Sequence, residues 1–192
     1  MAITIKRRNA EASRAAILAS ARKLFARSGY DGVGLREIAA EAGVTAMLAN
    51  RYFGSKEQLF ARVLEDVTAH SFILTPEALA SDDLPRSMAT SLVAITTPGD
   101  NPLDGFAMMM HSLGNKHAVR IARRNVERGR QKELVALLNG PYAEERASVI
   151  LALVAGFQAM RQTLGLSALV KADPNVMTHI LAGVLKQLTR GE

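Results

Sequence analysis

The sequence predicts an all-α fold. No run of residues alternates polar and apolar side chains as a strand does, and apolar residues recur at the 3.6-residue spacing of helices. Glycine and proline fall between these apolar stretches, where they end helices. A hydrophobic content of 48% and a charged content of 22% are typical of a globular chain, and 192 residues suffice for one large domain or two small ones.

The first predicted helix covers residues 10–28. Gly29 follows it in the position of a left-handed C-terminal cap. The apolar face of this helix carries Ile17, Leu18, Ala21, Leu24 and Phe25. A second helix is predicted over residues 35–42 and a third over residues 45–53, with Gly43 giving the chain the backbone freedom for a sharp turn between them.

A fourth helix is predicted to open at Ser55 and to run to about residue 70. Ser55 and Gln58 have the spacing of a capping box, in which each side chain satisfies a backbone N–H of the first turn. The stretch TPEALASDDLP then marks a boundary or bend, since it is rich in proline and acidic residues. Further helices are predicted over residues 84–97, 103–114, 116–138, 143–165 and 175–189.

Residues 35–53 have the pattern of a helix-turn-helix, which presents its second helix to the major groove of DNA. Ile38 and Ala39 occupy the inner face of the first helix, and the small alanine allows close packing. Val44 packs directly after the turn, and Thr45 is a good N-cap for the second helix. Helix pairs joined by glycine also occur in bundles that never touch DNA, so the local pattern alone leaves both interpretations open.

The side chains around this motif suit both bases and phosphates. Asn50 can bond adenine bidentately, and small apolar groups can contact the thymine methyl. Arg51, Lys56 and the Tyr52 hydroxyl suit phosphates. The candidate DNA-binding residues are Arg8 in a basic N-terminal arm, Arg36, Thr45, Ala46, Met47, Asn50, Arg51, Tyr52 and Lys56. The alternatives are that Arg36 and Lys56 are ordinary surface charges and that Ala46 and Met47 are packing residues.

The positive charge of the chain is concentrated near this motif. Residues 1–60 carry ten Lys and Arg against five Asp and Glu, whereas residues 61–192 carry fourteen against thirteen. A net charge of +6 for the whole chain therefore lies almost entirely in the first 60 residues. A local basic patch is what a polyanion partner binds, because each neutralised phosphate releases counterions.

Several short blocks of residues follow one another in a fixed order and spacing in the first 60 residues. Ile17, Ala21, Leu24 and Phe25 precede Gly29–Tyr30, the stretch REIAAEAGV follows, and Tyr52–Phe53 precede SKEQLF. In this order and spacing the chain resembles the TetR family of one-component repressors over its whole length. The resemblance implies an N-terminal three-helix helix-turn-helix domain (residues 1–55, with the basic arm) and a C-terminal helical effector-binding and dimerisation domain (residues 56–192).

The resemblance also implies a ligand-responsive transcriptional regulator. Members of the family are mostly repressors that release a palindromic double-stranded DNA operator when a small molecule binds the C-terminal domain. This chain departs from the family pattern at Ala49–Asn50, where Leu-Tyr is usual, and at Gly34, where Thr is usual. The face of the third helix that meets the bases is therefore not fixed by the resemblance. The alternative function is a helical binding or assembly module without sequence-specific DNA recognition.

Two C-terminal helices are predicted to form a homodimer interface. Small residues lie among large apolar ones between residues 147 and 160, and apolar residues recur every three or four positions between 176 and 188. Two such helices from each subunit would make a four-helix interface. The candidate interface residues are Val149, Leu153, Gly156, Met160, Ile180, Val184 and Leu188. The alternative is a single monomeric core.

The candidate residues of an effector pocket follow no regular spacing in the sequence. Methionines adapt to irregular ligands, and a soft apolar patch around residues 106–111 offers one polar side chain. The candidate ligand-binding residues are Met88, Phe106, Met109, His111 and Phe157. The alternative is that all of them are core residues. Residues 120–132 form a basic stretch on a predicted helix, which is typical of a solvated face and also fits an anionic effector or an acidic partner.

Nothing in the sequence predicts an enzyme, a cofactor or a metal site. The four histidines have no metal-ligand spacing, there is no cysteine, and neither a nucleophile elbow nor a phosphate-binding glycine loop occurs. The longest uncharged apolar run has 14 residues, against the roughly 20 that a membrane span requires. We therefore expect no membrane insertion and a cytoplasmic location.

Overall fold

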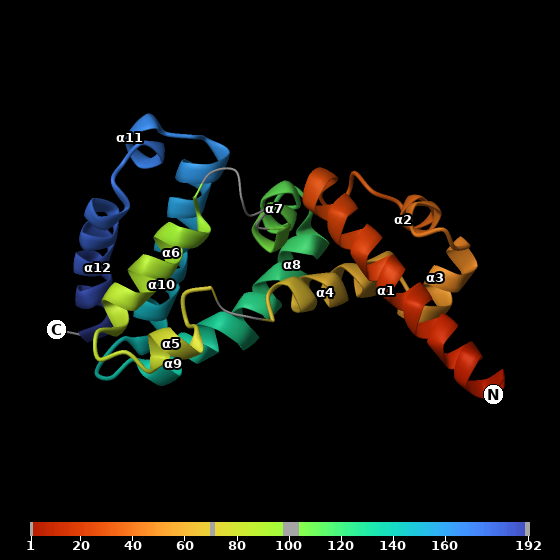
Figure 1. The fold of residues 1–192 in the computed structure, drawn as a ribbon, viewed down its shortest axis with the longest axis horizontal. Coiled ribbons are helices and arrows are strands. Elements are labelled where there is room, and N and C mark those ends of the chain that lie inside the picture. Colours follow the sequence, from red (N-terminus) through yellow and green to blue (C-terminus); the bar gives the residue numbers. More distant parts are fainter. Residues whose placement is uncertain (1, 70–71, 98–103, 191–192) are drawn as a thin grey trace. The chain divides into compact units, whose positions relative to one another are not determined.

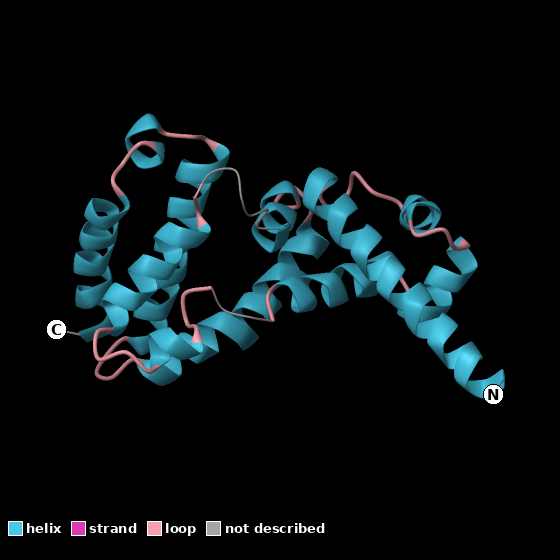
Figure 2. Ribbon diagram, viewed as in Figure 1, coloured by secondary structure: helices cyan, strands magenta, loops and turns pink. Residues whose placement is uncertain are grey.

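The computed structural model describes residues 2–69, 72–97 and 104–190, with the side chains of residues 2–8 left undescribed. Within these ranges the chain forms helices joined by turns, without strands (Figure 2). The helices are α1 (Ala2–Ser28), α2 (Leu35–Glu41), α3 (Ala46–Phe53), α4 (Lys56–Val67), α5 (Pro76–Leu79), α6 (Leu84–Ile95), α7 (Asp104–His111), α8 (Lys116–Val126), α9 (Lys132–Leu137), α10 (Ala143–Gln158), α11 (Ser167–Val170) and α12 (Pro174–Arg190), with π-helical turns η1 (Glu127–Gln131) and η2 (Ala159–Thr163). The all-helical prediction is confirmed.

The chain divides into two compact units. Unit 1 contains residues 1–69 and 103–125, and unit 2 contains residues 70–102 and 126–192. Unit 1 therefore extends well past the expected domain boundary at residue 55, since it takes in α4, α7 and nearly all of α8. Each unit has its own hydrophobic core.

Unit 1 is built around α1, which contacts α2, α3, α4 and α7 (Figure 1). Its core centres on three aromatic rings, with the Phe25 and Phe60 centroids 5.0 Å apart and the Tyr30 and Phe60 centroids 5.2 Å apart, both pairs edge to face. Segments distant in the sequence complete the unit. The Tyr30 amide donates to Ser112 Oγ at 2.9 Å, and Asn115 Nδ2 donates to Asp31 Oδ1 at 2.7 Å.

The turns of unit 1 follow from the residues at its helix ends. Gly29 has φ +67°, which confirms the predicted left-handed cap, and Gly43 also has φ +67°, a conformation that uses the backbone freedom predicted for this turn. Thr45 caps α3 by accepting from the Leu48 amide at 3.2 Å. Ser55 and Gln58 form the complete capping box at the start of α4. These caps fix where each short helix begins and therefore how it is aimed.

Unit 2 is a helical bundle in which α6 and α12 make the most extensive contact and α10 packs beside α12 (Figure 1). Its core includes Leu92, Ile150 and Leu185, each almost fully buried. Arg146 ties α10 to the end of α12, because its Nη1 donates to the Leu188 carbonyl oxygen at 3.0 Å. This contact joins the beginning of one helix to the end of the other, so α10 and α12 are antiparallel.

The predicted helices differ from the observed ones mainly at their ends. The first helix begins at Ala2 instead of residue 10, and the fourth ends at Val67 instead of residue 70. The helices predicted over 116–138 and 143–165 contain the π-helical turns η1 and η2, which a 3.6-residue pattern cannot distinguish from α-helix. The break predicted over residues 75–85 contains the one-turn helix α5, which Thr75 caps by accepting from the Ala78 amide.

Candidate nucleic-acid interface

Helices α2 and α3 form the helix-turn-helix. The turn is closed by backbone hydrogen bonds from the Gly43 amide to the Ala40 carbonyl at 3.0 Å and from the Val44 amide to the Ala39 carbonyl at 2.9 Å. Ile38 and Ala39 are buried on the inner face of α2, as the pattern predicted. The pair of helices is therefore held as one rigid element against the core of unit 1.

Helix α3 has a clear inner and outer face. Ala49 is fully buried, while Met47 is 82% exposed and Asn50 and Arg51 are also exposed. Residues three and four apart share one face of a helix, so Met47, Asn50 and Arg51 form one outward stripe. Thr45 is exposed at the start of this helix, whereas Ala46 is half-buried against the core.

Tyr52 lies at the edge of this surface and contacts α1. The guanidinium carbon of Arg14 lies 5.7 Å from the centre of the Tyr52 ring and 5.8 Å from that of Phe53, so one cation covers both rings. Tyr52 is half-buried, which leaves it partly accessible. Sequence reasoning missed Arg14, because only the packing of α1 across α3 brings the two segments together.

Lys56 lies at the start of α4 over the ring of Tyr30, with its Nζ 4.3 Å from the ring centre. Burial raises the pKa of the Tyr30 hydroxyl, and the nearby carboxylates of Glu57 and Asp31 raise it further. Tyr30 therefore stays protonated at neutral pH. The cation–π contact orients the Lys56 ammonium and does not neutralise it.

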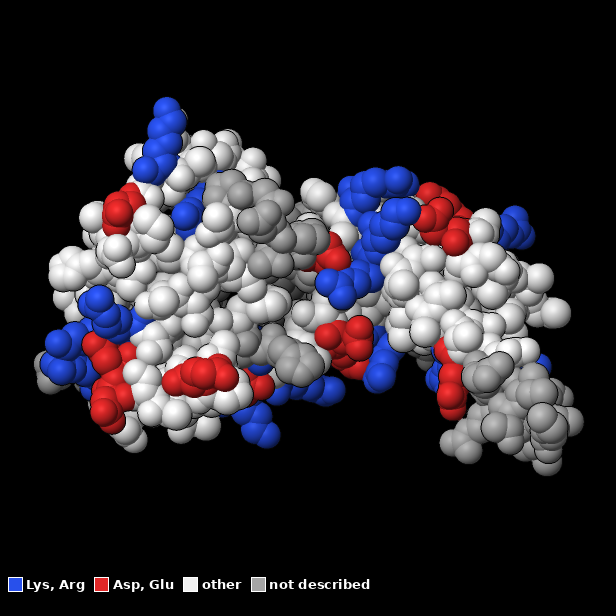
Figure 3. All heavy atoms as spheres, in the orientation of Figure 1, with Lys and Arg blue, Asp and Glu red and all other residues white. Residues whose placement is uncertain are grey.

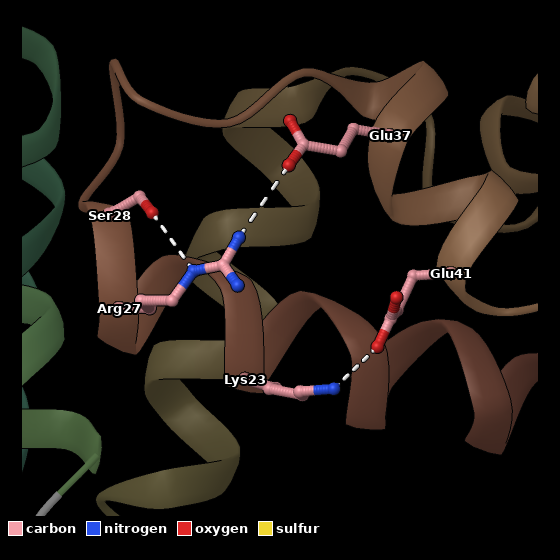
Figure 4. A network of polar contacts seen from close by, with 5 residues as sticks. All are labelled: Lys23, Arg27, Ser28, Glu37 and Glu41. Atoms are coloured by element: carbon pink, nitrogen blue, oxygen red, sulfur yellow. Dashed lines mark hydrogen bonds and ion pairs between the residues drawn. The ribbon is translucent and has the colours of Figure 1, made fainter.

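Ion pairs fix α2 against α1 (Figure 4). Lys23 Nζ lies 2.6 Å from Glu41 Oε1, and Arg27 Nη2 lies 3.9 Å from Glu37 Oε1. The hydrogen bond and the charge of Lys23 lower the pKa of Glu41. Arg36, on the same helix, is exposed and has no ion pair among the described residues.

Figure 3 shows blue and red side chains adjoining one another on parts of the drawn face of unit 1. Beside the two α1–α2 pairs, Arg22 Nε lies 2.6 Å from Asp104 Oδ2 and joins α1 to α7. By contrast, α3 carries no acidic residue, and Arg51 has no ion pair among the described residues. The candidate Arg8 lies outside the residues whose side chains are described.

The predicted effector residues are divided between the two units. Met88 and Phe157 belong to the core of unit 2, with Met88 fully buried. Phe106, Met109 and His111 all lie on α7 in unit 1, where Met109 packs on the core. His111 Nδ1 lies 2.7 Å from the Ala26 carbonyl oxygen at the end of α1. Neither unit therefore brings the whole set together.

The predicted dimer residues lie mostly on exposed faces of unit 2. Val149 is 50% exposed and Ile180 is 53% exposed, although both are large and apolar. Met160, Val184 and Gly156 are exposed as well, while Leu153 and Leu188 are half-buried. The opposite faces of the same helices are buried through residues such as Ile150 and Leu181.

Solved structures that share this fold include transcriptional regulators. They include a TetR-family member from Streptomyces coelicolor A3 (TM-score 0.64, 20% identity, 92% of this chain and 98% of that one) and a transcriptional regulator from Rhodococcus sp. Rha1 (TM-score 0.61, 21% identity, 90% and 94%). Another is NalD, the secondary repressor of the MexAB-OprM multidrug efflux pump in Pseudomonas aeruginosa (TM-score 0.59, 22% identity, 92% and 96%). At these identities the likeness is one of fold. No curated protein matches the chain.

The described residues form a helix-turn-helix in one unit and a second helical bundle in the other, which is the architecture of a DNA-binding transcriptional regulator. The family model for bacterial regulatory proteins of the tetR family matches residues 17–63, and that for the tetracyclin repressor-like C-terminal domain matches residues 82–188. The chain therefore belongs to the TetR family. This confirms the family that the sequence blocks indicated.

Two further observations concern membranes and metals. Among the described helices, none is both long enough and apolar enough to cross a membrane. The part of the chain that the structure describes contains no group of three or more His, Asp or Glu side chains that could hold a metal ion.

Proposed function

We propose that this protein is a ligand-responsive repressor that binds a palindromic DNA operator as a homodimer and releases it when a small molecule binds unit 2. The outward stripe of Met47, Asn50 and Arg51 on α3 carries the proposal. The Met47 side chain is 82% exposed and lies beside an exposed amide and an exposed guanidinium, so the stripe contributes little buried surface to the core of unit 1. The same three groups supply an apolar contact, a base-edge hydrogen bond and a phosphate contact.

The remaining candidate contacts surround this stripe. Arg36 at the start of α2, Tyr52 at the end of α3 and Lys56 at the start of α4 lie at the ends of the helices that flank the recognition surface. Ends of this kind are where phosphate contacts form, and such contacts set the register of the protein on the duplex. Thr45 and Ala46 lie at the N-terminal end of α3, which approaches the bases in a helix-turn-helix.

The exposed apolar faces of α10 and α12 support a homodimer. Large apolar side chains that are half exposed on two adjacent antiparallel helices are typical of a surface that a second subunit covers. A two-fold axis through these helices would pair them as a four-helix interface. Operator recognition then requires two half-sites about 34–36 Å apart, or a multiple of that distance.

Helix α4 is our candidate for the element that transmits effector binding. Its first turn follows the recognition helix α3, and at its far end the Thr68 hydroxyl donates to Asn125 Oδ1 of α8 at 2.8 Å. The chain continues from α8 through η1 into α9 of unit 2 without leaving helical geometry. An effector shifts operator affinity only by its differential affinity for the two states of the protein.

The experiment is a mobility-shift titration of the full chain on a palindromic fragment from upstream of its own gene. A repressor of this kind binds that fragment in preference to random DNA, with affinity that falls steeply as salt rises. Equal affinity for both fragments at every salt concentration would reject specific operator binding and favour the helical assembly module. The repressor activity that NalD has in its own organism suggests upstream fragments as the first targets.

A further inference from the structure

A buried arginine lies in the π-helical turn η2 of unit 2. The Arg161 side chain is only 3% exposed, and three of its hydrogen bonds hold the guanidinium in place. Its Nη1 donates to the Val93 carbonyl oxygen at 2.7 Å and to Thr96 Oγ1 at 2.9 Å, and its Nε donates to the Leu169 carbonyl oxygen at 3.1 Å. These acceptors come from the end of α6 and from α11, which lie at one end of unit 2 (Figure 1).

This guanidinium has no counter-ion in the described chain. No carboxylate of the described residues forms an ion pair with Arg161, and its acceptors are two carbonyls and a hydroxyl. Burial lowers the pKa of Arg161, which is the expected effect of removing a cation from water without a matching anion. Buried arginines are normally paired, because an uncompensated buried charge is costly.

Polar groups around Arg161 lack partners as well. Gln158 is 7% exposed, yet its side-chain amide makes no hydrogen bond to a described residue, and neither does the Nη2 of Arg161. Among the described residues no side-chain nitrogen or oxygen is both fully buried and unpartnered, so these groups keep some contact with solvent. Gln158 is the last residue of α10 and Arg161 lies in the π-helical turn η2 that follows it, so both belong to the same short segment of the bundle.

A third unpartnered group lies at the same level of the bundle. Arg146, near the beginning of α10, contacts Leu188, near the end of α12. Because the two helices are antiparallel, the end of α10, where Gln158 lies, is at the level of the beginning of α12. Thr178 lies there, is 8% exposed, and its hydroxyl makes no hydrogen bond to a described residue. Apolar groups adjoin this level too, since the Phe157 ring centre lies 5.7 Å from the guanidinium carbon of Arg161.

We infer that Arg161 and Gln158 form the anion-recognising end of the effector site, and that the effector is a small apolar molecule bearing a carboxylate. The inference rests on the proposed function, in which unit 2 binds a small molecule. Arg161 Nη2 and the Gln158 amide supply N–H donors for which the described residues offer no acceptor, and the guanidinium supplies the charge. A purely structural arginine that ties α6 to α11 would explain the bonds of Nη1 and Nε. It would leave the side-chain amide of Gln158, a residue that is only 7% exposed, without a hydrogen-bond partner among the described residues.

The test measures the melting temperature of the full-length protein with a series of carboxylates. The probes are sodium acetate, benzoate, octanoate and decanoate, each compared with its uncharged amide at neutral pH and constant ionic strength. We expect the larger carboxylates to raise the melting temperature of the wild-type protein and the amides to leave it unchanged. Titration calorimetry then gives the dissociation constant of the best carboxylate.

Three variants separate recognition from stability. Arg161→Gln removes the charge, Gln158→Met removes the amide while keeping the side-chain length, and Arg86→Gln removes an exposed arginine of α6 as the matched control. Because the Gln158 amide has no hydrogen-bond partner among the described residues, Gln158→Met is expected to melt at or above the wild-type temperature without ligand. Its carboxylate affinity, like that of Arg161→Gln, is expected to fall by about tenfold or more.

The inference is overturned if no carboxylate raises the melting temperature, if the amides raise it equally, or if Gln158→Met binds carboxylates as tightly as Arg86→Gln does. Should Arg161→Gln fail to fold, the Gln158→Met result alone decides. An operator-binding assay distinguishes failure of the carboxylate site from failure of the proposed ligand-induced release. Carboxylates that raise the melting temperature without weakening operator binding would reject ligand-induced release and leave the carboxylate site intact.

Discussion

At the scale of single residues, Ala49 determines which side chains of α3 point outward. Because Ala49 is small and fully buried, α3 packs closely on the core of unit 1 along that line. The residues on either side of it then divide, with Phe53 turned inward and the stripe of Met47, Asn50 and Arg51 turned outward. The departure from the family pattern at residues 49–50 thus coincides with the position that orients the recognition helix.

Asn50 and Arg51 are predicted to contribute to DNA binding in different ways. Asn50→Ala should remove one base-edge contact and reduce discrimination at one base pair by about 1–3 kcal/mol. Arg51→Ala should weaken binding to all sequences by a similar factor. It should also reduce the magnitude of the slope of log K against log salt concentration by about one, the effect of losing one phosphate contact. Competition binding of single-base operator variants over a range of salt concentrations measures both effects. If Asn50→Ala weakened every sequence by the same factor, its assignment to the bases would be wrong.

At the scale of elements, two glycines with the same backbone conformation are predicted to respond differently to substitution. Gly29 and Gly43 both have φ +67°, which costs an L-residue about 1–2 kcal/mol. A Cβ on Gly43 would meet nothing within 4 Å, whereas a Cβ on Gly29 would lie 2.3 Å from the His111 carbonyl oxygen of α7. Gly43→Ala should therefore lose only the conformational cost, and Gly29→Ala considerably more. Urea unfolding of the two variants tests this, and equal losses would contradict the close contact of α1 with α7.

The Lys23–Glu41 pair between α1 and α2 predicts a pH dependence. The pKa of Glu41 is lowered in the folded state, so its stabilising effect is present above the ordinary carboxyl pKa and is lost as pH falls through the lowered value. In Lys23→Met the pKa of Glu41 should return toward its ordinary value, because its hydrogen bond and charge partner are gone. NMR titration of the Glu41 carboxyl carbon measures it. An unchanged pKa in that variant would show that Lys23 is not its partner in solution.

The helices and their caps were predictable because their signals are local. Capping residues such as Thr45 and the Ser55–Gln58 pair act over three positions, and apolar spacing marks each buried face. The π-helical turns were not predictable, since one extra residue per turn barely alters an apolar pattern. The contact of Arg14 with Tyr52 was equally hidden, because it depends on how α1 crosses α3.

At the scale of the whole molecule, the division into units shows which unit each candidate effector residue belongs to, and the sequence alone could not show this. Met88 and Phe157 share the apolar character of the α7 residues Phe106 and Met109, but character does not reveal which core a residue joins. Residues 103–125 belong to unit 1, so α7 and its candidate residues Phe106, Met109 and His111 are in the unit that contains the helix-turn-helix. The unpartnered groups around Arg161 therefore direct the search for the effector to unit 2.

The proposed dimer predicts that one face of α12 carries the assembly and the other carries the fold. Ile180 is 53% exposed, whereas its neighbour Leu181 is only 4% exposed. Ile180→Glu places a charge on the exposed face, so it should produce a folded monomer whose melting temperature reflects only the lost association. Leu181→Ala, the matched core variant, should lose about 2–5 kcal/mol of unfolding free energy within each subunit.

Sedimentation equilibrium, thermal unfolding and operator binding together separate these outcomes. A monomeric Ile180→Glu should bind a single half-site weakly and lose the preference for a two-half-site operator, because two recognition helices then no longer share one rigid body. An Ile180→Glu protein that remains dimeric with wild-type operator affinity would place the interface elsewhere on unit 2. The exposed apolar residues of α10 and α12 would then need another partner, since half-exposed isoleucine and valine side chains this close together are unfavourable in water.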